Sequence, residues 1–164
     1  MTPRAKTTAT IAAVAIVGFL IWRRKPIATV TTSEAFDLSS IGGPVTYPAP
    51  IKRFAEAIAR AEGFYVAGSI PQRAHNPGDL KMPNWTGPTL GSGISVFQSD
   101  GAGWSALYRQ LWIIVTGSSG NYYLDMSIEQ MAAKWTATEQ SAWARNVAGF
   151  LAVDPSVSLV SVLV

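Results

Sequence analysis

An apolar stripe that ends on a carboxylate is the feature that most constrains the fold of this chain. The stripe has the i, i+3, i+4, i+7 spacing of an amphipathic helix and consists of Ile51, Phe54, Ala55 and Ile58. Its next position is Glu62, and the residue after that is Gly63, a type that commonly ends helices. The pattern therefore predicts a helix over residues 51–62 that packs against a hydrophobic core, with Glu62 on its buried face.

A carboxylate directed toward a core is costly unless it is paired or protonated. Burial raises the pKa of such a group, and so does the negative end of a helix that stops at Gly63. Because a general acid must hold its proton near neutral pH, Glu62 is the candidate catalytic acid. In the alternative, the helix ends one turn earlier and Glu62 is an ordinary surface residue. Glu56 is expected to be a solvated helix carboxylate.

The composition excludes several kinds of site. The chain has no cysteine, which excludes disulfides, thiolate zinc sites and cysteine nucleophiles. Its one histidine, His75, excludes a metal site with several histidines. The first 25 residues carry five basic and no acidic side chains, whereas the rest carry eight basic and ten acidic ones. This nearly neutral body argues against a nucleic-acid partner. We expect neither a metal nor a cofactor.

The N-terminal residues predict a membrane anchor. Residues 7–22 are uncharged and would span about 24 Å as a helix, which is short of the ~30 Å hydrocarbon core. Trp22 and the flanking basic residues can make up the difference at the interface. A cleaved signal peptide is the alternative, but basic residues 23–25 stand where a cleavage site needs small neutral ones. Basic residues on both sides leave the orientation open.

Three parts are therefore expected: an anchor over residues 1–25, a tether over residues 26–50 and a globular head over residues 51–164. The tether is assigned from its many Pro, Gly, Ser and Thr residues and its lack of periodicity. A chain of that length reaches roughly 25–30 Å on average.

The head is predicted to be mainly α-helical, with a small irregular or β insertion after its first helix. The insertion is rich in Gly and Pro and includes a candidate strand at residues 94–97. Signals for later helix starts are Asp100 as an N-cap, capping boxes of Ser127 with Gln130 and Thr136 with Glu139, and the pair Asp154-Pro155. The apolar sides of these helices carry tryptophans that we assign to the core: Trp104, Trp112, Trp135 and Trp143.

Several segments of the head follow one another in an order that resembles a known family. They are Ala61-Glu62-Gly63-Phe64, the loop His75-Asn76-Pro77-Gly78-Asp79-Leu80, and residues 96–99, 101–110, 126–135 and 144–147. The order resembles the lysozyme-like domains of phage and prophage peptidoglycan-degrading proteins, which are related to lytic transglycosylases and goose-type lysozymes. The resemblance covers about residues 51–164. It implies a lysozyme-like α+β fold, peptidoglycan glycan strands as the partner, and Glu62 as the catalytic acid/base.

The chain departs from the family pattern at a few positions. His75 and Asp79 stand where the family usually or often has asparagine, and Trp135-Thr136-Ala137 replaces a Trp-Ala-Pro-like segment. These departures affect the expected substrate specificity more than the expected fold.

Four further residues are candidates for substrate contact: Asn76, Gln98, Tyr122 and His75. Asn76 could bond an acetamido group or hold a tight turn, and we favour the turn. Gln98 follows the predicted strand, and Tyr122 lies in a polar aromatic loop of the kind that lines sugar grooves. The alternative for His75 is a solvated loop histidine.

A single-carboxyl mechanism fits the acidic residues best. The possible second carboxylates, Asp79, Asp100 and Asp125, stand at predicted turns or caps, where a structural role is favoured. The resemblance implies that Glu62 protonates the glycosidic oxygen and then acts as base on the muramoyl 6-hydroxyl. A positioned water would give hydrolysis instead.

The expected function is thus that of a membrane-tethered peptidoglycan lytic transglycosylase, phage or prophage encoded, with residues 7–22 in the lipid membrane. Its head would face the cell wall or periplasm, or the protein would be part of a virion. The alternatives are a non-catalytic peptidoglycan-binding module and a virion or envelope structural protein. The sequence does not set the oligomeric state.

Overall fold

The computed structural model describes residues 46–164, which form a mainly helical domain. Its elements in chain order are α1 (Ala49–Ala61), α2 (Ile70–Arg73), β1 (Thr89–Leu90), β2 (Ile94–Ser95), α3 (Asp100–Val115), α4 (Ile128–Trp135), α5 (Gln140–Leu151) and α6 (Val160–Leu163). The predicted anchor over residues 1–25, and the predicted tether up to residue 45, lie outside the described residues. Within the described part, no helix is both long enough and apolar enough to cross a membrane.

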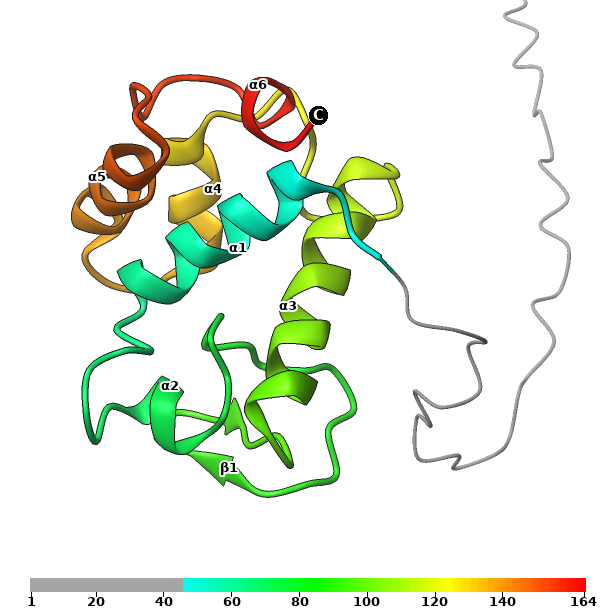
Figure 1. The fold of residues 1–164 in the computed structure, drawn as a ribbon, viewed down its shortest axis with the longest axis vertical. Coiled ribbons are helices and arrows are strands. Elements are labelled where there is room, and N and C mark those ends of the chain that lie inside the picture. Colours follow the sequence, from blue (N-terminus) through cyan, green and yellow to red (C-terminus); the bar gives the residue numbers. More distant parts are fainter. Residues whose placement is uncertain (1–45) are drawn as a thin grey trace, which may run out of the picture. The chain divides into compact units, whose positions relative to one another are not determined.

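Helix α1 lies in the middle of the described residues and contacts α3, α5 and α6 (Figure 1). The stripe that predicted its buried face is fully buried: Ile51, Phe54, Ala55 and Ile58. The same core takes in Leu107 and Leu111 from α3, Met131 from α4 and Val147 from α5. The predicted helix is therefore confirmed, and it begins at Ala49, two residues earlier than expected.

The end of α1 is built by a Schellman motif around Gly63. Glu62 is the C-cap residue with φ −78° and ψ −8°, and Gly63 follows with φ +77°. The Gly63 N–H donates to the carbonyl of Arg60 at 3.1 Å, and the Phe64 N–H donates to the carbonyl of Ala59 at 2.9 Å. These are the two bonds of the motif, and the left-handed position favours glycine. Local sequence therefore places Glu62 at the last turn of α1.

The stretch between α1 and α3 contains a short antiparallel pair of strands. Thr89 pairs with Ser95 and Leu90 with Ile94. The strand predicted at residues 94–97 is confirmed over its first two residues, while its partner strand and the four-residue helix α2 were not predicted. In Figure 1 this stretch lies beyond the C-terminal end of α1.

The predicted helix starts are confirmed at one position and corrected at others. Ser127 and Gln130 form the capping box of α4, each side chain accepting from the other's backbone N–H. Asp100 is not the N-cap of α3, because Ser99 has that role and Asp100 stands in the first turn. The side-chain oxygen of Ser99 accepts from the Ala102 N–H at 3.3 Å.

The last two predicted helix starts are wrong. Glu139 precedes α5 in a left-handed conformation with no side-chain cap, and Thr136 donates to the carbonyl of Thr138 instead of capping. Asp154 accepts from the backbone and hydroxyl of Ser156, and the final helix starts only at Val160. In both places a tight local turn of polar side chains competes with the helix start.

Gly103 marks the closest approach between α3 and the loop that follows α2. A Cβ atom built on Gly103 would overlap the carbonyl oxygen of His75 and lie 2.9 Å from Cδ of Pro77. Two backbone segments therefore meet here without space for a side chain, and Gly103 is needed for packing rather than for backbone freedom.

We predict that Gly103→Ala destabilises the domain by about 2 kcal/mol, because the His75 segment must move to admit the methyl group. The matched control is Gly149→Ala in α5, where no atom of residues 46–164 outside the local helix lies within 4 Å of the new Cβ. That substitution should stabilise the helix by about 0.5–1 kcal/mol. Urea unfolding of the three proteins measures both effects. Equal stability of Gly103→Ala and wild type would refute the close approach.

Candidate active site

The carboxyl group of Glu62 is held by α5. Trp143, in the first turn of α5, donates its indole N–H to Oε1 of Glu62 at 2.7 Å. The Trp143 side chain is only 4% exposed, so the donor is part of the core. The packing of α1 on α5 thus brings together residues 81 positions apart and fixes the orientation of the carboxyl group.

Burial raises the pKa of Glu62 from its ordinary value of 4.5 to about 7. The Trp143 N–H opposes this shift, because it stabilises the ionised form. The negative charge of Asp79 raises the pKa further, and the indole of Trp135 lowers it slightly. Near neutral pH, Glu62 is therefore present both as an acid and as its conjugate base. A group that must first give and then accept a proton needs this balance.

Asn76 holds the loop that follows α2. Its side chain is fully buried, and its amide donates to the carbonyls of Leu80 and Ser95, each at 2.9 Å. Its side-chain oxygen accepts from the Leu80 N–H at 2.9 Å. The expectation of a substrate contact at Asn76 is corrected: the side chain has no exposed surface, and the favoured alternative of a turn residue fits it.

Asp79 lies in the turn that Asn76 holds. Its N–H donates to the Asn76 carbonyl at 3.1 Å, and its backbone is left-handed, with φ +51°. Oδ1 of Asp79 is buried and has no hydrogen-bond partner within residues 46–164. Burial raises the pKa of Asp79, and the nearby charge of Lys81 lowers it. Asp79 thus stands at a turn, as expected, but its charge also acts on Glu62.

His75 and Gln98 lie on two segments whose backbones are hydrogen-bonded to each other. Nδ1 of His75 is 2.6 Å from Oδ1 of Asp100, in a pair that is largely exposed. Gln98 is exposed, and the preceding residue, Phe97, donates its N–H to the carbonyl of Ala74 at 2.9 Å. The two candidates therefore sit on adjoining segments. Neither has a hydrogen bond or ion pair with Glu62 within residues 46–164.

Tyr122 approaches Glu62 through two tryptophan rings. The centroids of Tyr122 and Trp135 are 5.8 Å apart, and those of Trp135 and Trp143 are 6.1 Å apart. Tyr122 is partly buried, and its hydroxyl donates to the carbonyl of Lys134 at 3.4 Å. The three rings form an aromatic row that ends at Glu62, with Tyr122 as its outer member.

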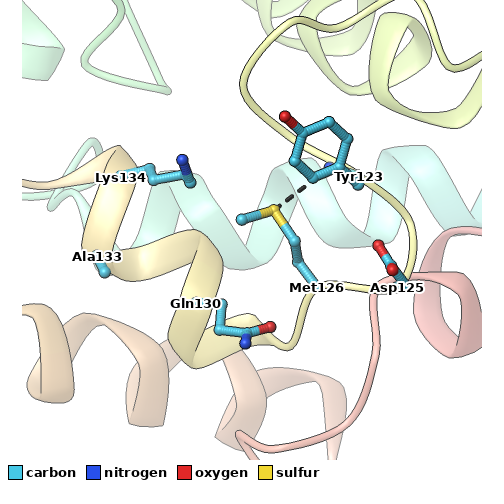
Figure 2. Close-up of a pocket in the computed structure, with 6 residues that line it drawn as sticks. All are labelled: Tyr123, Asp125, Met126, Gln130, Ala133 and Lys134. Carbon is cyan, nitrogen blue, oxygen red and sulfur yellow. Dashed lines mark hydrogen bonds between the residues drawn. The ribbon is translucent and has the colours of Figure 1, made fainter. Parts of the chain in front are cut away.

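A surface hollow lies between α4 and the loop that precedes it (Figure 2). It is lined by Tyr123, Asp125, Met126, Gln130, Ala133 and Lys134. The N–H of Tyr123 donates to the sulfur of Met126 at 3.3 Å. Neither Glu62 nor Trp143 lines this hollow, so we place the candidate active site at the perturbed carboxyl and not here.

Sequence reasoning missed two features of the site. Trp143 was assigned to the core, and its second role at Glu62 was not predicted, although a buried indole N–H usually needs an acceptor. Asp79 was assigned to a turn, and no local pattern indicated that its charge would act on Glu62. The predicted candidates divide into a loop side with His75 and Gln98 and an aromatic side with Tyr122.

Comparisons with known proteins leave the family of this chain open. No family model matches the sequence, and neither the curated proteins nor the solved structures include a match.

Proposed function

We propose that this chain is a membrane-tethered peptidoglycan lytic transglycosylase with a lysozyme-like head, and that Glu62 is its acid/base. The observation that carries the proposal is the state of Glu62: a partly buried carboxyl at a helix end, with a pKa of about 7 and an indole N–H on one oxygen. A carboxyl of this kind suits protonation of a leaving group near neutral pH. The resemblance of the sequence segments supports peptidoglycan as the substrate.

In the proposed reaction the protonated Glu62 gives its proton to the oxygen of the bond between N-acetylmuramic acid and N-acetylglucosamine. That bond breaks between C1 of the muramoyl sugar and the oxygen, and the leaving sugar departs with a new hydroxyl group. The muramoyl 6-hydroxyl then attacks C1, and its proton passes to the Glu62 carboxylate. The products are a 1,6-anhydromuramoyl end and a regenerated acid, with no water consumed.

The remaining surroundings of Glu62 suit an extended glycan. The aromatic row ends in the partly buried Tyr122, and tyrosine presents both an apolar face and a hydroxyl to a sugar. Gln98 is exposed, and His75 is partly exposed with its Nδ1 on Asp100, so both can reach a polar ligand. We therefore propose that Tyr122, Gln98 and His75 contact substrate.

The proposed anchor and tether would keep the head close to the cell wall. Tethering raises the local concentration of a binding module at its target, so high affinity is not required. A phage or prophage protein that opens the wall, from the membrane or within a virion, fits this arrangement.

The test is digestion of purified peptidoglycan sacculi by the full chain in mild detergent, with the soluble muropeptides identified by mass spectrometry. Anhydromuramoyl ends are expected. Reducing ends alone would make the protein a lysozyme-type hydrolase with the same acid. No released fragments, together with retention on insoluble peptidoglycan, would replace the enzyme by a binding module. Neither release nor retention would favour a virion or envelope structural protein.

A further inference from the structure

Asp79 is held in an arrangement that costs free energy. Its backbone is left-handed, a conformation that aspartate tolerates better than most residues, but its buried Oδ1 has no hydrogen-bond partner among residues 46–164. A buried carboxylate oxygen without a partner costs free energy, because it has lost its hydrogen bonds to water and gained none in the protein. Costs of this kind are retained most often at functional sites.

The position of Asp79 is also rigid. The buried amide of Asn76 makes three hydrogen bonds across the loop. The loop then packs against α3, where a Cβ atom on Gly78 would come within 2.8 Å of Leu107 and one on Gly103 would overlap the His75 carbonyl. A charge that is fixed before substrate arrives needs no reorganisation during the reaction.

The charges that act on Asp79 and on Glu62 have opposite signs. Burial and the negative charge of Asp79 act together on Glu62 and favour its protonated form. Burial raises the pKa of Asp79 as well, but the charge next to Asp79 is the positive one of Lys81, which opposes that rise. Two carboxyl groups whose surroundings differ in this way are the usual basis for separate acid and anion roles.

We propose that Asp79 is the second carboxylate of the active site, an anion held beside protonated Glu62 that stabilises the positive charge developing on the sugar ring as the glycosidic bond breaks. The inference rests on the proposed glycosidase function. Cleavage passes through an oxocarbenium-like transition state, so a fixed negative charge near the ring lowers the barrier. Asp79 transfers no proton in this role, and the reaction balances as written for Glu62 alone.

The test compares Asp79→Asn with wild type in the full chain. Asparagine adopts the left-handed conformation readily, and the resembled family often has it at this position, so the loop should keep its shape. We expect kcat to fall about 10²-fold with little change in KM. The Glu62 carboxyl, followed by ¹³C NMR in glutamate-labelled protein, should titrate at lower pH in the variant, because the neighbouring negative charge has been removed.

The matched control is Asp125→Asn, an exposed aspartate on the loop before α4, which should change neither the rate nor the titration. A titration of Glu62 that does not move in Asp79→Asn would overturn the inference, as would a shifted titration with an unchanged kcat. If wild type is active and Asp79→Asn is equally active, only this inference fails. If wild type itself releases no fragments, the proposed function is wrong, and the role of Asp79 that depends on it is wrong as well.

Discussion

Glu62→Gln is expected to lower the rate of peptidoglycan cleavage about 10³-fold. Glutamine fills the same space and can still accept from the Trp143 indole, but it has no proton to give to the glycosidic oxygen. Removing a general acid costs about 10²–10⁴-fold in rate, and in the proposed reaction the same group is also the base. Release of muropeptides from sacculi at a fixed enzyme concentration measures the effect.

The matched control for this loss is Glu56→Gln on the same helix. Glu56 accepts from Arg60 at 2.8 Å and from the Tyr65 hydroxyl at 2.7 Å, near the surface. Loss of the Glu56 charge should leave the rate of peptidoglycan cleavage within about twofold of that of wild type, since exposed ion pairs contribute little to stability. Equal activity of Glu62→Gln and wild type would remove Glu62 from the mechanism, whatever the protein does to peptidoglycan.

The second large effect is on stability, and it depends on pH. The folded chain holds the Glu62 proton up to about pH 7, whereas the unfolded chain releases it near pH 4.5. The folded state therefore binds more protons within this window, and the domain loses stability as the pH rises through it. The difference in pKa corresponds to about 3 kcal/mol, all of it lost above pH 7.

Glu62→Gln should remove this loss, because glutamine does not ionise. At pH 8 the variant is expected to have a larger free energy of unfolding than wild type. This difference between variant and wild type should be about 2 kcal/mol smaller at pH 5. Denaturant unfolding at the two pH values measures the change. Asp79 contributes in the same direction, since its pKa is also raised, so Asp79→Asn is a necessary comparison. An excess of the same size at both pH values would show that Glu62 is not held protonated by the fold.

Such a stability gain from removing the proposed catalytic group would be a trade-off between function and folding. Active-site residues are often held in surroundings that destabilise the folded state. At Glu62, the burial that raises its pKa toward neutrality is the same burial that makes its ionisation costly.

Local patterns in the sequence predicted those helices and helix ends that depend only on residues a few positions apart in the chain. The stripe from Ile51 to Ile58 predicted α1, and Gly63 predicted its end, because side-chain periodicity and left-handed backbone are properties of short segments. The capping box of Ser127 and Gln130 was predicted for the same reason. The pair Thr136 and Glu139 has the same spacing and fails, because the backbone at Glu139 is left-handed.

Only the tertiary structure decided which distant groups meet at Glu62. Nothing near residue 62 in the sequence indicates that Trp143 donates to its carboxyl or that Asp79 raises its pKa. Both depend on how α5 and the loop around Asn76 pack against the rest of the fold, and this packing brings together residues far apart along the chain. The sequence by itself therefore determined which carboxyl stands at the end of a helix. The packing makes this carboxyl partly buried and hydrogen-bonded and raises its pKa to about 7, because desolvation and charge depend on spatial neighbours.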